Sequence, residues 1–190
     1  WKDYSNLQVG SSLIENVKNL QRWSFEENLA KQGKPVDKSE WGMTPQTVNA
    51  YYSPLFNEIV FPAAILQPPF YDYKADAAVN FGGIGAVIGH ELSHGFDDSG
   101  SQYDGNGNLN NWWTDEDREK FEAAADALVA QFEAYEPVPG VFINGRFTLG
   151  ENIGDLGGSS VAFDALQMYL KDKGNPGLID GYKVHLHRIE

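Results

Sequence analysis

The stretch VIGHELSHGFDD, residues 87–98, holds two of the four histidines of the chain, four residues apart. Residues at this spacing lie one above the other on a helix, so the imidazoles of His90 and His94 can chelate one cation. Glu91 lies about 100° further round the helix and can reach a water molecule on that cation without being a ligand. Two histidines satisfied by their neighbours are the alternative, but this is uncommon for a glutamate-flanked pair in an apolar helix. We therefore favour a metal site.

A catalytic zinc site takes three protein ligands and leaves one position for water, so a third ligand is needed. The extended motif with a glycine and a third histidine further along is excluded, because its positions are occupied here by Asp97 and Gly100. Two sources remain. One is a carboxylate later in the chain, and the other is the pair of tail histidines, His185 and His187.

The segment GENIGD, residues 150–155, offers two carboxylates four apart at the start of a predicted helix. Glu151 as the metal ligand and Asp155 as a hydrogen-bond partner of a ligand imidazole is the most economical assignment. Acidic residues also stabilise a helix N-terminus without any metal. With His90 and His94 as the other zinc ligands and Glu91 as general base, the predicted reaction is metal-assisted amide hydrolysis.

Two glycine-rich stretches resemble other binding motifs but do not match them. GGIGAVIG misses the dinucleotide-binding pattern because Ile88 stands where the third glycine belongs. DGNGNLNNWWTD misses the calcium-loop pattern because Leu109 replaces the turn glycine and Asp115 replaces the final glutamate. We expect close helix packing at the first stretch and a turn at the second.

Local signals predict the elements that carry these residues. Ser12 with Glu15 and Thr114 with Asp117 are capping pairs, each followed by apolar residues at helical spacing. The stretches VNAYYS and NEIVFP are rich in β-branched and aromatic residues, which indicates two short strands with a free edge. Helices are predicted over about residues 12–31, within 69–95, from 114 to 137 and over about 149–172.

Composition limits the class of protein. The 190 residues, 42% of them hydrophobic, suit one globular domain, and there is no repeat or linker that would split it. A net charge of -13 disfavours nucleic acid and anionic membrane surfaces as partners. No apolar run approaches the roughly 20 residues that span a bilayer. Because cysteine is absent, any zinc must be held by imidazoles and carboxylates.

Four segments together resemble one family. VNAYY, IVFPAAILQPPF, GHELSHGFDD and GENIGDLGG are similar to segments of the neprilysin-like zinc peptidases, which include neprilysin, the endothelin-converting enzymes and bacterial oligopeptidase O. A thermolysin relative would share the chemistry but lack the NAYY and LQPPF segments. The resemblance implies that residues 1–190 form a zincin (thermolysin-like) metallopeptidase domain, α+β and predominantly helical with a small sheet. The implied activity is endopeptidase action on oligopeptides.

The resemblance also implies the roles of the polar residues. His90, His94 and Glu151 would hold one zinc ion, Glu91 would be the catalytic base, and Asp155 would orient a ligand histidine. These implied roles agree with those argued above from residue types and spacing.

Substrate contacts are implied by the resemblance alone. Asn49 and Ala50 would bind the substrate backbone at a strand edge, so that the peptide adds a strand to the sheet. Ile65, Phe70 and Val87 would form the pocket for the residue that follows the scissile bond, with a preference for an apolar side chain.

Relatives carry an upstream helical lobe and a segment after the IDGY motif that supplies a histidine and an arginine to the reaction. Here KVHLHRIE follows Tyr182, so we expect an incomplete domain that is weak or inactive by itself. The alternative is a non-enzymatic remnant that binds peptide or a partner. The lack of cysteine favours a bacterial member over the disulfide-bearing animal ectodomains and leaves cytoplasm, cell envelope and secretion open.

Overall fold

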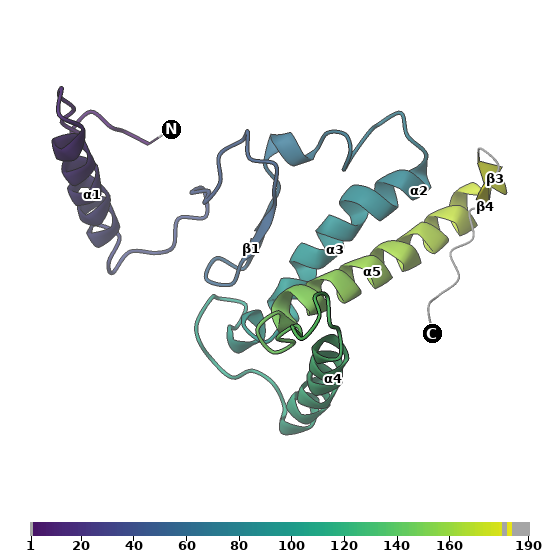
Figure 1. Ribbon diagram of the computed structural model, residues 1–190. Coiled ribbons are helices and arrows are strands. Elements are labelled where there is room, and N and C mark those ends of the chain that lie inside the picture. Colours follow the sequence, from purple (N-terminus) through teal and green to yellow (C-terminus); the bar gives the residue numbers. More distant parts are fainter. Residues whose placement is uncertain (1, 180–181, 184–190) are drawn as a thin grey trace. The chain divides into compact units, whose positions relative to one another are not determined.

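The computed structural model describes residues 2–179 and 182–183 (Figure 1). The chain forms two compact units, Trp1–Glu40 and Trp41–Glu190. The boundary between them is not among the features predicted from the sequence.

The first unit contains one helix, α1 (Leu13–Leu29). Its start follows the predicted capping pair, because the Ser12 hydroxyl accepts the backbone N–H of Glu15 at 3.4 Å. Tyr4 packs on Trp23 with 4.9 Å between ring centroids. The predicted helix is confirmed, but none of its residues is buried.

In the second unit, one run of helical backbone leads to the histidines. It consists of α2 (Ala77–Asn80), the π-helical turn η2 (Phe81–Gly85) and α3 (Ala86–Ser93), followed by the 3-10 turn η3 (His94–Phe96). The prediction of helix in this region is confirmed. The π-helical turn is a departure that the periodicity did not predict.

The long helix α5 (Leu149–Lys173) lies along α3, although about sixty residues separate them in the sequence (Figure 1). Two glycines make this approach possible. A Cβ added at Gly89 would lie 2.8 Å from the Cα of Gly158, so neither position has room for a side chain. Close helix packing therefore explains part of the glycine-rich stretch, as predicted.

Helix α4 (Asp115–Glu133) begins as its capping pair predicts, since the Thr114 hydroxyl accepts the N–H of Asp117 at 3.1 Å. It packs on the start of α5. Two groups of buried apolar residues form the core of this unit: Ala125, Val129 and Leu149 between α4 and α5, and Ala50, Ile65 and Ile84 near the strands.

The strands form small antiparallel pairs. β1 (Tyr51–Ser53) pairs with β2 (Glu58–Val60), and β3 (Leu178–Ile179) pairs with β4 (Tyr182–Lys183). The 3-10 turns η1 (Ala63–Ile65) and η4 (Gly100–Gln102) complete the elements. The prediction of a mostly helical chain with a small sheet is confirmed. Across the described ranges, no helix is long and apolar enough to cross a membrane.

Candidate metal centre

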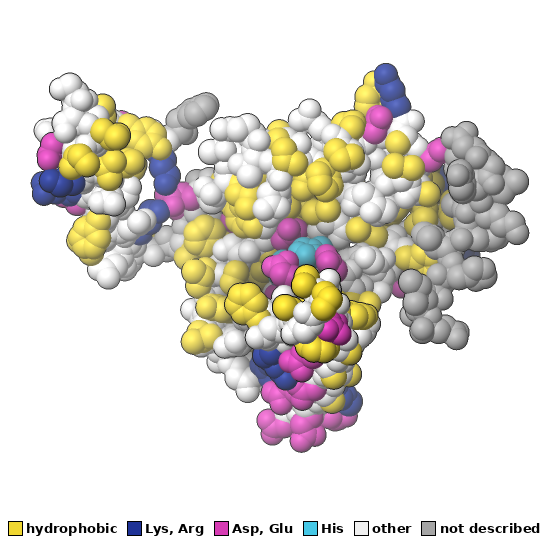
Figure 2. Space-filling view, in the orientation of Figure 1, with side chains coloured by type: hydrophobic (Ala, Val, Ile, Leu, Met, Phe, Trp, Pro, Cys, Tyr) yellow, Lys and Arg dark blue, Asp and Glu magenta, His cyan; other side chains and the backbone are white. Residues whose placement is uncertain are grey.

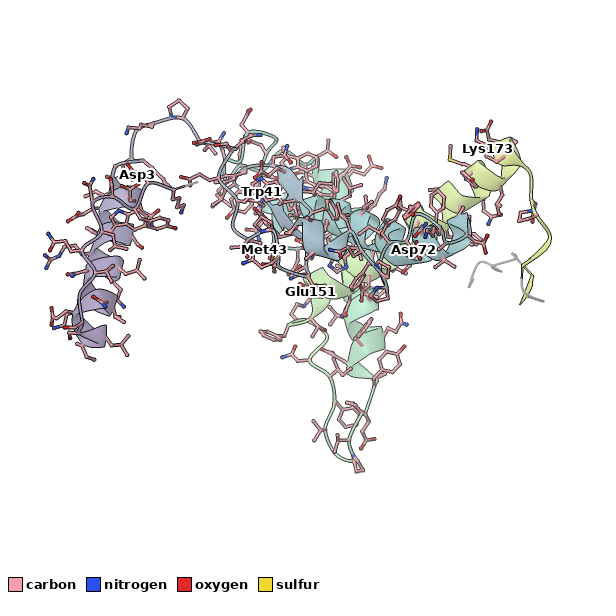
Figure 3. All side chains as sticks on the ribbon, turned by 90° about the horizontal axis from the view of Figure 1, so that it is seen from above. Asp3, Trp41, Met43, Asp72, Glu151 and Lys173 are labelled. Carbon is pink, nitrogen blue, oxygen red and sulfur yellow. The ribbon has the colours of Figure 1, made fainter. Side chains whose placement is uncertain are left out.

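The last turn of α3, the start of η3 and the first turn of α5 bring two imidazoles and one carboxylate together. His90 and His94 lie with ring centroids 4.5 Å apart and ring planes nearly perpendicular. The Oε2 atom of Glu151 lies 3.4 Å from Nε2 of His90 and 3.9 Å from Nε2 of His94. Ligand atoms of all three residues lie within 4.8 Å of one another. In Figure 2 a histidine is visible at the surface, with acidic side chains on either side of it, and Figure 3 labels Glu151.

Both histidines use their other ring nitrogen to bind an aspartate. Nδ1 of His90 lies 2.9 Å from Oδ1 of Asp155, and Nδ1 of His94 lies 2.8 Å from Oδ2 of Asp97. A carboxylate accepts a hydrogen bond, so each Nδ1 carries a proton, and in the neutral imidazole each Nε2 then presents its lone pair. The two Nε2 atoms face Glu151, which is the arrangement of donors that a cation needs.

Asp97 contacts His94 of the candidate centre and was not assigned a role in the sequence analysis. Its second oxygen, Oδ1, accepts the backbone N–H groups of Ser99 at 2.8 Å and Gly100 at 2.6 Å, so the carboxylate is fixed in place. The signal that could have found it is its position three residues after His94. This spacing brings an aspartate side chain back to the ring when the helix ends in a tight turn.

The charges of this pair follow from its contacts. The hydrogen bond to Asp97 raises the pKa of His94, although burial of the ring opposes this. Burial acts to raise the pKa of Asp97, but the hydrogen bonds from His94, Gly100 and Ser99 outweigh it and hold that pKa below its usual range. The pair therefore favours an ionised aspartate beside the ring.

Glu91 lies in α3, beside His90, and its carboxylate faces Tyr52 of β1. Its side chain is 6% exposed, and burial raises its pKa, while the neighbouring histidines and the backbone N–H of Tyr52 in β1 act in the opposite direction. The carboxylate thus lies between the two histidines and the strand. A buried carboxyl with a raised pKa is suited to accepting a proton near neutral pH.

A cavity of about 340 Å³ gives access to this centre. His94 and Glu151 form part of its wall, and Tyr52 and Pro54 approach it from the β1 side. The ligand atoms therefore border open space beside the strand.

Asn49 and Ala50, for which the resemblance implies substrate binding, directly precede β1, because the strand predicted over VNAYYS begins only at Tyr51. Asn49 is exposed, whereas Ala50 is 5% exposed and belongs to the apolar cluster. Ile65 is in the same cluster at 2% exposure, with the half-buried Phe70 and Val87 packed against it. A bound side chain could reach Phe70 and Val87 more readily than Ile65. The other possible third ligands, His185 and His187, lie outside the described residues.

Comparison with known proteins identifies the family to which the chain is similar. A sequence model described as peptidase family M13 matches residues 49–184. Neprilysin-3 of Drosophila melanogaster is 44% identical over 173 residues, which are 90% of this chain and 22% of that protein. Endothelin-converting enzyme 1 of Homo sapiens is 48% identical over 174 residues, which are 92% of this chain and 22% of that protein.

A solved structure has a similar fold. The zinc metalloprotease Zmp1 of Mycobacterium tuberculosis, in complex with an inhibitor, superposes with a TM-score of 0.88 at 56% identity. The match covers 96% of this chain and 29% of that protein. The chain thus spans less than a third of the length of each of these relatives.

Proposed function

The chain belongs to peptidase family M13, and from this membership we propose that it carries the active site of a zinc-dependent metalloendopeptidase that hydrolyses oligopeptides. Residues 1–190 would be a catalytic domain of zincin type. Support comes from one histidine in α3 and one in the turn η3 that continues it, the glutamate that follows the first histidine, and a third candidate ligand on the helix packed alongside.

The observation that carries the proposal is the convergence of the Nε2 atoms of His90 and His94 with a carboxylate oxygen of Glu151. Imidazole nitrogens and a carboxylate oxygen are ligands that catalytic zinc takes, with three from the protein. The hydrogen bonds to Asp155 and Asp97 fix both rings with Nε2 free, which also fits zinc. When bound there, zinc supplies a Lewis acid and lowers the pKa of a water molecule to about 7.

The proton transfers fall to the chain's own residues. Glu91 is next to a ligand histidine but is not among the three converging ligands, so its carboxylate is free to take a proton from the attacking water. It would then return this proton to the leaving amine. Asp155 and Asp97 do not take part in that transfer and act as positioning residues through the rings that they hold.

The substrate would lie along β1. This strand pairs only with β2 within the part of the chain that the structure describes, so one edge is without a strand partner there. The side chain of Asn49 and the carbonyl of Ala50, which directly precede β1, would bind the peptide backbone beside that edge. Phe70 and Val87, with Ile65 behind them, would contact an apolar residue after the scissile bond. Burial of such a side chain contributes about 1.5–3 kcal/mol, enough to set a preference.

We propose further that this chain alone is a weak peptidase. The side chains of Glu151 and Asp155 are 74% and 83% exposed, so water screens the charges at the centre. Peptide binding with little or no turnover is the second candidate function, and the same exposure supports it.

Elemental analysis together with cleavage of a quenched peptide tests the function. The proposal expects one zinc ion per chain and slow cleavage that a chelator stops and added zinc restores. A chain that binds zinc and peptide but does not cleave would support the second candidate. A chain that takes up no zinc would contradict the hydrolytic function, and peptide binding by such a chain would support the second candidate.

A further inference from the structure

The loop before α2 is tied to the helical run that carries the histidines. The side chain of Asn80, the last residue of α2, makes two hydrogen bonds to the backbone of Asp72. Its Oδ1 accepts the N–H of Asp72 at 2.9 Å, and its Nδ2 donates to the carbonyl of Asp72 at 2.8 Å. Figure 3 labels Asp72 beside this helical run. Both groups are partly buried, so water does not readily replace these bonds.

The π-helical turn adds a third hydrogen bond to the same loop. The backbone N–H of Ile84 donates to the carbonyl of Phe70 at 2.8 Å. Single π-helical turns within α-helices are often found at functional sites. Here a backbone donor of the turn binds a loop residue.

Gly83 lets the loop come close to the turn. A Cβ added at Gly83 would lie 2.4 Å from the carbonyl oxygen of Phe70, a separation that requires the loop or the helix to move. The neighbouring Gly82 has no atom within 4 Å of an added Cβ. Only one of the two adjacent glycines is therefore needed for the contact with Phe70.

Phe70, whose carbonyl accepts the Ile84 N–H, packs with Val87 against the apolar cluster of Ala50, Ile65 and Ile84. Val87 is in α3, the helix that also carries His90 and Glu91. The contacts of residues 80–84 therefore fix where the Phe70 ring lies relative to the helix of the metal ligands.

We propose that Asn80 and Gly83 are specificity-positioning residues, which hold Phe70 so that the site selects a large apolar side chain after the scissile bond. This inference rests on the proposed function, because it requires Phe70 to contact the substrate. Neither residue touches the reacting atoms, and their effect passes through the Phe70 backbone.

The test compares two peptide hydroxamates that differ only in this side chain, one benzyl and one methyl. Their affinities for the zinc-loaded chain are measured by titration calorimetry, which does not depend on turnover. The wild-type chain should prefer the benzyl compound about tenfold or more. In Asn80→Ala and in Gly83→Ala this preference should fall about threefold or more, with little change in the affinity for the methyl compound.

Two matched controls separate this effect from general damage. Asn16 of α1 makes the same pair of hydrogen bonds, to the N–H and carbonyl of Gly10, so Asn16→Ala removes an equivalent clamp elsewhere. Gly82→Ala adds the same methyl group one residue away, where there is room. Both controls should keep the wild-type preference.

A second measurement needs no metal. Hydrogen exchange of the Ile84 amide reports the bond to Phe70, and it should be about tenfold faster in Asn80→Ala than in Asn16→Ala. An unchanged benzyl preference in both test variants would overturn the inference. If neither hydroxamate binds the wild-type chain, the proposed function fails instead. The exchange rate then decides whether Asn80 holds the loop, and an unchanged rate would overturn that as well.

Discussion

The carboxylate of Asp97 accepts a hydrogen bond from Nδ1 of His94 at 2.8 Å, while its other oxygen accepts backbone N–H groups from the turn that follows. The position of this ring is therefore set by the turn after the helix as well as by the helix itself. Asp155 performs the same role for His90 from a different helix.

Asp97→Asn should weaken zinc binding about 10-fold to 100-fold, because an amide cannot stabilise the ring as a carboxylate does. The measurement is competition with a fluorescent zinc chelator. Asp104→Asn is the control, since Asp104 also accepts two backbone N–H groups, from Asn106 and Asn108, in a different loop. Equal zinc affinity in both variants would show that Asp97 does not act on the metal centre.

Glu91→Gln should retain one zinc ion per chain and abolish hydrolysis, because glutamine keeps the shape of the side chain but cannot take a proton. Zinc content and cleavage of a quenched peptide are measured on the same preparation. Cleavage at the wild-type rate would exclude Glu91 as the general base.

Glu151→Val should lose the metal, because removal of one of three ligands leaves two imidazoles from one helix. Elemental analysis after dialysis measures the loss. Glu119→Val is a matched control on an exposed position of α4. Full zinc occupancy in Glu151→Val would instead make His185 and His187 the leading candidates for the third ligand.

Gly158→Ala should lower the free energy of unfolding by about 1–3 kcal/mol, because an added Cβ would lie 2.5 Å from the carbonyl oxygen of Ala86 and from the backbone nitrogen of His90. Helices α3 and α5 would have to separate, so zinc affinity should fall as well. Thermal and denaturant unfolding measure the first effect, and chelator competition measures the second. The control Gly82→Ala should be neutral or stabilising, and a similar result for Gly158→Ala would contradict the packing argument.

Much of the helical structure was predictable because its signals are local. The Thr114 cap and the glycines after the last helix lie within a few residues of the boundaries that they set. The pairing of His90 with His94 follows from helix geometry alone. The carboxylate at Glu151 could be proposed from residue type, but its place beside the rings depends on how α5 packs.

The features that could not be predicted depend on contacts between distant segments. The π-helical turn at 81–85 donates a backbone hydrogen bond to the carbonyl of Phe70, more than ten residues earlier. The spacing of apolar residues within the turn does not indicate this partner. The burial of Ile65 depends on Ala50 and Ile84, which belong to separate elements. The roles of Asn49, Ala50 and the apolar pocket in substrate binding stay predictions.

The π-helical turn has a consequence for the orientation of everything that follows it. Such a turn holds one residue more than an α-helical turn, so the side chains of α3 are rotated by about 100° about the axis relative to an unbroken continuation of α2. The direction in which His90 and His94 point from the helix axis therefore depends on η2 (Phe81–Gly85). If the same residues formed a regular α-helix, both imidazoles would swing away from α5, whereas deletion of Gly82 would remove the extra residue and leave them in phase.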